Sequence, residues 1–234
     1  HYLDEEHASR TIEAYINDYL KEEIQQEGLV RHLPAFARFL DAVAFSSGEL
    51  VNYSNIGRDC GVDAKTVQAY FQILVDTLLG NFLEPFRKQR RRQIISATPK
   101  FYLFDVGVAG GLMRRNLRGL RGPEFGRAFE HFILMELLAY RSYAEKKIPL
   151  HFWRTKEGDE VDFVLDRGRI ALEVKGSDSV DIHALKGIKL FMKEYQPEHA
   201  YVVSQDHAPR QLESGLQVLP WQTFCEMLWK GEIF

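Results

Sequence analysis

The sequence predicts a mixed α/β (α+β) fold, in which a helical segment and a helix–turn–helix precede a mixed β-sheet flanked by helices. Two observations indicate this class. Apolar residues recur at helical spacing through residues 9–80. After residue 150 short strands alternate with helices, which is typical of a layered α/β domain. The chain has 234 residues, enough for two modest domains.

The net charge of −3 is unevenly distributed. Residues 1–45 contain nine acidic and four basic residues, whereas residues 87–100 contain six basic and no acidic ones. This asymmetry predicts separate surfaces with separate roles. Cys60 and Cys225 have no CxxC context, so we expect reduced thiols and no structural zinc. There is no apolar run of about 18 residues, so we expect a cytoplasmic protein without a membrane span.

Residues 1–47 are expected to form an acidic helical segment. One helix is predicted over residues 9–27, and Gly28 is its expected end. A second apolar stripe includes Leu33, Phe36 and Val43 and ends before the Ser46-Ser47-Gly48 run.

Residues 48–112 are expected to form a winged helix. A short helix at 52–58, a turn at Gly61 and a longer helix opened by Asp63 give the helix–turn–helix order. Strands at 82–87 and 100–104 then flank a basic loop, which is where a wing belongs. An ordinary helical hairpin is the alternative interpretation.

The basic loop and the second helix carry the expected nucleic-acid contacts. Five of the six residues in 87–92 are basic, which favours contact with phosphate, although a solvated surface loop has the same composition. Winged helices also serve as protein-docking modules. The residues predicted to bind nucleic acid are Lys65, Arg87, Lys88, Arg90, Arg91 and Arg92.

Residues 113–234 are expected to form the α/β domain. A glycine- and arginine-rich connection spans 106–122, and a strong helix follows at 123–140. Strands are predicted at 151–154, 160–165, 169–175, 200–204 and 216–219, with helices at 180–195 and 221–229.

The strands at 160–165 and 169–175 bring acidic residues together. Side chains alternate between the two faces of a strand, so Glu173 and Lys175 share one face. If Arg167-Gly168 is a two-residue hairpin loop, Asp162 lies directly opposite Glu173.

Two directly opposed carboxylates repel each other unless one is protonated or a cation lies between them. A hard divalent cation, Mg²⁺ or Mn²⁺, resolves the repulsion. Lys175 could then neutralise a scissile phosphate or orient a water molecule. A Glu-x-Lys run on its own is also typical of a salt-bridged surface pair.

The spacing of Asp162 and Glu173-Val174-Lys175 resembles the PD-(D/E)xK nuclease superfamily. The resemblance implies that Asp162 and Glu173 bind metal and that Lys175 acts in hydrolysis. It also implies an acidic residue on the preceding helix, where Glu130 follows Gly126 by one turn; a solvated helix glutamate is the alternative. The proline expected before the aspartate is absent.

The order of the motifs along the whole chain resembles the C-terminal region of a prokaryotic AAA-type ATPase family. In that family a winged helix precedes a domain of unknown function with the restriction-endonuclease-like fold. The resemblance implies a partner, the missing N-terminal ATPase domain, because the chain has no GxxxxGK[ST] loop. Residues 1–47 resemble the lid or connector of such an ATPase. Residues 66–70, 99–107, 126–130, 161–163 and 173–176 carry this resemblance.

The leading hypothesis is therefore a DNA-binding, Mg²⁺-dependent DNA endonuclease fragment. The first alternative is a non-catalytic module that binds DNA or protein and regulates the missing ATPase. The second is a protein-docking winged helix that drives assembly of a homo-oligomer.

Overall fold

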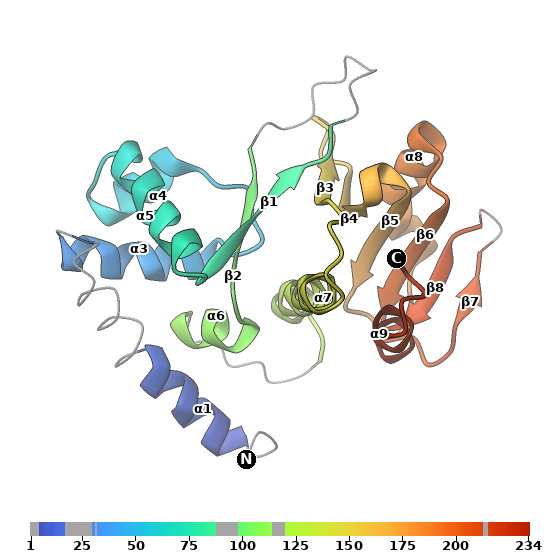
Figure 1. Cartoon of the computed structure of the whole chain (residues 1–234), viewed down its shortest axis with the longest axis horizontal. Helices are drawn as coiled ribbons and strands as arrows, with labels where there is room; N and C mark the ends of the chain where they lie inside the picture. Colours follow the sequence, from blue (N-terminus) through green and yellow to red (C-terminus); the bar gives the residue numbers. More distant parts are fainter. Residues whose placement is uncertain (1–4, 17–29, 31, 88–97, 114–119, 213–214) are drawn as a thin grey trace. The chain divides into compact units, whose positions relative to one another are not determined.

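The protein combines helices with a mixed β-sheet, so the predicted α+β class is confirmed (Figure 1). The computed structural model describes residues 5–16, 30, 32–87, 98–113, 120–212 and 215–234. The chain divides into two compact units, here called unit 1 (His1–Phe82 and Lys100–Asn116) and unit 2 (Leu83–Pro99 and Leu117–Phe234).

Unit 1 contains the helix–turn–helix. Its described elements are α1 (Glu5–Ala14), α3 (Leu33–Phe45), α4 (Tyr53–Cys60), α5 (Ala64–Asp76), the start of β1 (Gly80–Pro85), β2 (Lys100–Leu103) and α6 (Val106–Leu112). Gly61, with φ of 72°, makes the predicted turn between α4 and α5. The Asp63 side chain accepts the Thr66 amide at 2.8 Å and caps α5. Helix α3 shares one hydrophobic core with α4 and α5.

Helix α6 lies where the sequence predicted only a connection. Three of its seven residues are glycine, and glycine disfavours helices in isolation. The tertiary contacts explain the difference. A Cβ at Gly107 would lie 2.8 Å from Ile12 of α1, and one at Gly111 would lie 2.8 Å from Ile16. The glycines therefore allow the close packing that stabilises this helix. The rest of the helix predicted over 9–27 lies outside the described residues.

Unit 2 is built around a mixed sheet. Its elements are the end of β1, α7 (Pro123–Tyr143), β3 (Leu150–Arg154), β4 (Glu160–Leu165), β5 (Ile170–Lys175), α8 (Lys186–Tyr195), β6 (His199–Ser204), β7 (Arg210–Gln211), β8 (Gln217–Pro220) and α9 (Trp221–Trp229). The strand order is β1-β3-β4-β5-β6-β8-β7. Strands β3, β4 and β5 are antiparallel neighbours, whereas β5, β6 and β8 run parallel.

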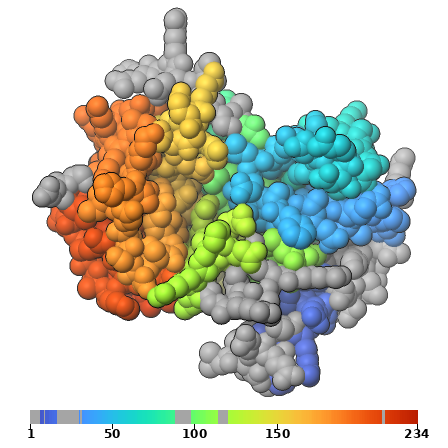
Figure 2. Space-filling model, turned by 180° about the vertical axis from the view of Figure 1, so that it is seen from behind, coloured from blue at the N-terminus to red at the C-terminus, as the bar shows by residue number. Residues whose placement is uncertain are grey.

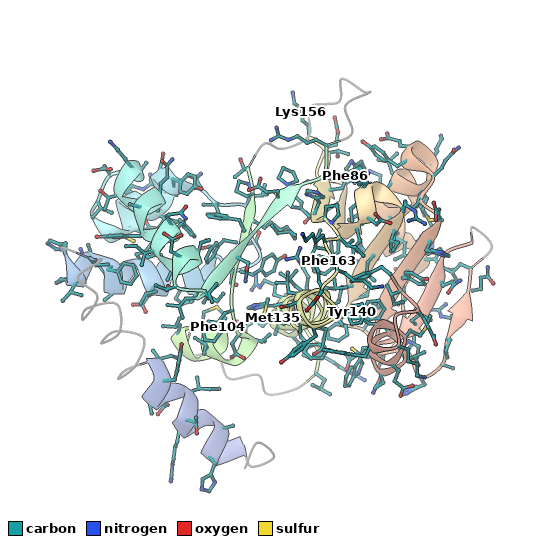
Figure 3. All side chains as sticks on the ribbon, viewed as in Figure 1. Phe86, Phe104, Met135, Tyr140, Lys156 and Phe163 are labelled. Carbon is teal, nitrogen blue, oxygen red and sulfur yellow. The ribbon has the colours of Figure 1, made fainter. Side chains whose placement is uncertain are left out.

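Helices cover both faces of the sheet in unit 2. One face shares a hydrophobic core with α8, including Val164, Ala171 and Phe191. Orange atoms from this part of the chain form one portion of the surface seen in Figure 2. Helices α7 and α9 contact each other and the sheet strands. Phe163, labelled in Figure 3, is fully buried. Within the described residues, every helix is too short or too polar to span a bilayer.

Candidate functional site

The β4–β5 hairpin has the predicted register. Its loop is longer than the two residues predicted: Asp166 to Arg169 connect the paired residues Leu165 and Ile170, and Asp166, Arg167 and Gly168 have φ of 47°, 58° and 92°. Phe163 pairs with Leu172, and Val164 and Leu165 pair with the next two residues toward the loop. The paired residues end at Phe163 and Leu172, one residue before Asp162 and Glu173.

Glu173 is the most deeply buried acid of this hairpin, with 7% of its surface exposed. Its Oε1 accepts the Lys175 ammonium at 2.5 Å. Its Oε2 is buried and has no hydrogen-bond partner in the described structure. Burial raises the pKa of Glu173; the Lys175 ammonium opposes this, and Glu130 and Glu160 raise the pKa further. Glu173 is therefore a buried carboxyl with one oxygen, Oε2, that is available to a ligand.

Lys175 lies in a field of negative charge. Burial lowers the pKa of its ammonium, but Glu173, Asp162 and Glu130 together outweigh burial and raise the pKa above its ordinary value. Lys175 therefore stays charged at neutral pH. The carboxylates of Asp162 and Glu130 are thus close enough to act on the charge of Lys175.

Asp162 has a structural contact that the sequence did not predict. Its Oδ2 accepts the backbone N–H of Val174 at 2.7 Å. In a regular ladder of the same register, the carbonyl of Val161 would be that acceptor. Instead Val161 pairs with Trp153 of β3, across a register shift that gives β4 one extra residue near Asp162. This β-bulge turns the Asp162 carboxylate toward β5.

Glu130 lies half-buried on α7. A Cβ at Gly126, one turn earlier, would meet no atom within 4 Å, so there is room beside it. Glu160 of β4 is half-buried and accepts a hydrogen bond from Arg154 at 2.8 Å. Its effect on the pKa of Glu173 places it near the site. The sequence signal that could have identified Glu160 is its position on β4, two residues before Asp162.

The donor chemistry of these residues fits a divalent cation. Carboxylate oxygens are the ligands that Mg²⁺ prefers, and the unpartnered Oε2 of Glu173 is available to such an ion. The described residues contain no group of three or more His, Cys, Asp or Glu side chains already arranged around a metal position. Binding would therefore require the carboxylates of Asp162, Glu173 and Glu130 to draw together.

The predicted nucleic-acid contacts are only partly described. Lys65 is exposed on the first turn of α5, and Arg87 follows β1. Lys88, Arg90, Arg91 and Arg92 lie outside the described residues. The basic wing therefore stays a prediction.

Residues 1–118 match the model of a family described as Domain of unknown function (DUF8612), and the chain belongs to that family. Residues 125–224 match a second family, Domain of unknown function (DUF4143). That domain is found C-terminal to AAA ATPase domains in prokaryotic proteins, so this part of the predicted resemblance is confirmed. None of the curated proteins and none of the solved structures matches the chain. The nuclease fold stays a prediction.

Proposed function

We propose that the α/β domain is a Mg²⁺-dependent DNA nuclease, joined in this chain to a DNA-binding winged helix. The observation that supports this most is the Oε2 of Glu173, a buried carboxylate oxygen without a partner. Glu173 bonds Lys175, and Asp162 bonds the backbone of Val174, the residue between Glu173 and Lys175. A fold gains no stability from a buried, unpartnered carboxylate oxygen, so a ligand-binding role accounts for it better.

The topology also supports the proposal. Helix α7 precedes the antiparallel strands β3 to β5, so the preceding helix that the resemblance implies is present, and helix α8 and the parallel strand β6 follow. Glu130 comes from the first of these elements, and the other site residues come from the second and third strands.

The residues divide the chemistry among them. The carboxylates of Asp162, Glu173 and Glu130 would hold the cation. A bound Mg²⁺ supplies charge that polarises the scissile phosphate and lowers the pKa of an attacking water. Lys175, kept charged by these carboxylates, stabilises the negative charge that develops on the phosphate. Lys65, Arg87 and the basic wing would hold the DNA backbone.

The test is cleavage of plasmid and branched DNA with Mg²⁺ or Mn²⁺. We expect Asp162→Asn and Lys175→Ala to lose at least about a hundredfold in rate, in line with the loss of a metal ligand or a charge-stabilising group. Glu157→Gln and Lys156→Ala are matched controls, since both residues are exposed in the loop between β3 and β4. Lys156 is labelled in Figure 3. Variants of Asp162 and Lys175 that cut as fast as the wild type would refute the proposal.

The second candidate function is a non-catalytic module that binds DNA or protein and regulates an ATPase. The internal pairing of the site favours it: Lys175 already neutralises Glu173, and Asp162 already bonds Val174. DNA binding that weakens steeply with salt, without metal-dependent cleavage, would support this function. Stable self-association without DNA binding at low salt would instead support a docking role for the winged helix.

A further inference from the structure

Gln205 connects two segments that carry site residues. It follows Ser204, the last residue of β6, and Ser204 pairs with Lys175 at the end of β5. The Gln205 side-chain amide donates to the carbonyl of Gly176 at 2.7 Å, directly after Lys175. The same nitrogen donates to the carbonyl of Leu120 at 3.0 Å, three residues before α7 begins. One side chain thus bonds the end of β5 and the chain that enters α7.

The two connected segments also pack against each other. A Cβ at Gly176 would lie 3.1 Å from the Cα of Gly126 and 3.1 Å from Phe125, both in the first turns of α7. The backbone after Lys175 therefore lies directly on the start of α7. Glu130 follows Gly126 by one helical turn, so the position of the first turn determines where its carboxylate lies.

Further hydrogen bonds hold the segment that follows β5. The backbone N–H of Gln205 donates to Ser177 at 3.0 Å. Arg210 donates to the carbonyl of Val180 at 3.1 Å and to Asp206 at 3.2 Å. The ion pair between Arg121 and Asp178, at 2.7 Å, also joins the segment after β5 to the segment before α7, but both of its side chains are exposed and such pairs contribute little. The Gln205 amide, whose bond to Gly176 is partly buried, is therefore the contact to perturb.

We propose that Gln205 is a positioning residue for the cation site, and that it acts by holding Glu130 at a fixed place relative to Glu173 and Lys175. This inference rests on the proposed function, since it concerns the same cation. Removing the amide would let the start of α7 shift away from β5 while both elements stay folded. Glu130 would then contribute less to cation binding.

The test is a double-mutant cycle on Mn²⁺ affinity, measured without DNA by titration calorimetry. Gln205→Met keeps the length of the side chain, removes both donors and adds no charge. We expect it to weaken Mn²⁺ binding about tenfold, the lower range for groups that orient metal ligands. In a Glu130→Gln background the same change should alter the affinity by less than about twofold, because the group it positions is already gone.

Gln211→Met is the control, because Gln211 is exposed on β7 in the same unit. Gln205→Glu, compared with Gln211→Glu, gives a second pair if the methionine variant does not fold. An unchanged Mn²⁺ affinity in the Gln205 variants, or an equal loss with and without Glu130, would overturn this inference without contradicting the proposed cation site. A wild-type protein that binds no Mn²⁺ would overturn the proposed cation site and this inference with it.

Discussion

The hydrogen bond from Val174 to Asp162 allows the structural and cation-binding roles of Asp162 to be separated. Two substitutions do this. Asp162→Asn keeps an oxygen that can accept the Val174 N–H, but it removes the charge that a cation needs. Asp162→Ala removes both. The metal-free stabilities of the two variants should therefore differ, whereas their cation binding should be equally impaired.

The magnitude follows from the burial of the bond. Val174 is 8% exposed, so its N–H has little access to water once the carboxylate is removed. A buried donor left without an acceptor costs about 1–3 kcal/mol. We therefore expect Asp162→Ala to lower the free energy of unfolding of unit 2 by about 2 kcal/mol, or its Tm by about 4–8 °C. Asp162→Asn should cost less than about 1 kcal/mol, because a neutral amide oxygen replaces a charged one.

Tryptophan fluorescence during urea unfolding measures the free energy of unfolding of unit 2 in the intact chain. All three tryptophans, Trp153, Trp221 and Trp229, lie in unit 2, so the signal reports the unit that contains Asp162. Repeating the measurement with Mn²⁺ at about a hundred times its dissociation constant should stabilise the wild type by about 2.7 kcal/mol. Neither variant should gain a comparable amount.

Two results would refute this reasoning. If Asp162→Ala is as stable as the wild type, the bond to Val174 contributes nothing to stability. If Asp162→Asn is as unstable as Asp162→Ala, the charge of the carboxylate matters to the fold and its acceptor oxygen does not.

Three more perturbations test other parts of the structure. Lys175→Met should lower the metal-free stability by about 3 kcal/mol, because the buried carboxylate of Glu173 loses its partner. Mn²⁺ should raise the Tm of this variant more than that of the wild type. Equal Tm shifts in thermal scans would contradict this expectation. Gly187→Ala should destabilise unit 2 by about 3 kcal/mol in urea unfolding, since its Cβ would clash with the backbone carbonyl of Glu160 and α8 must shift. Wild-type stability of this variant would show that the packing of α8 on β4 is looser. Asp63→Ala should destabilise unit 1 near pH 7, because the Thr66 amide and hydroxyl lower the pKa of this capping carboxyl. Its stabilising effect is present above its unfolded pKa and is lost as the pH falls through its folded pKa. Circular dichroism melts should therefore show a Tm difference between variant and wild type that shrinks near pH 2.

The local pattern of the chain was sufficient to predict the hairpin at the centre of the candidate site. Strand alternation depends on a period of two residues, and centring the turn on Arg167-Gly168 predicts the register that pairs Phe163 with Leu172. The predicted loop length was wrong, because four residues connect Leu165 to Ile170, but the register is the same for both loop lengths. The Asp63 cap and the Gly61 turn of the helix–turn–helix were predictable because they too depend on local sequence. Asp63 and Gly61 act on backbone groups within a few residues of themselves.

Features that depend on distant parts of the chain could not be predicted in this way. Helix α6 forms because Gly107 and Gly111 pack against α1, although glycine disfavours helices locally. The β-bulge that turns Asp162 toward Val174 depends on pairing with β3. Gln205 is separated by 85 residues from one carbonyl that it binds and by 29 from the other. Long-range packing creates these contacts, and sequence periodicity contains no information about which distant backbone groups a side chain will reach.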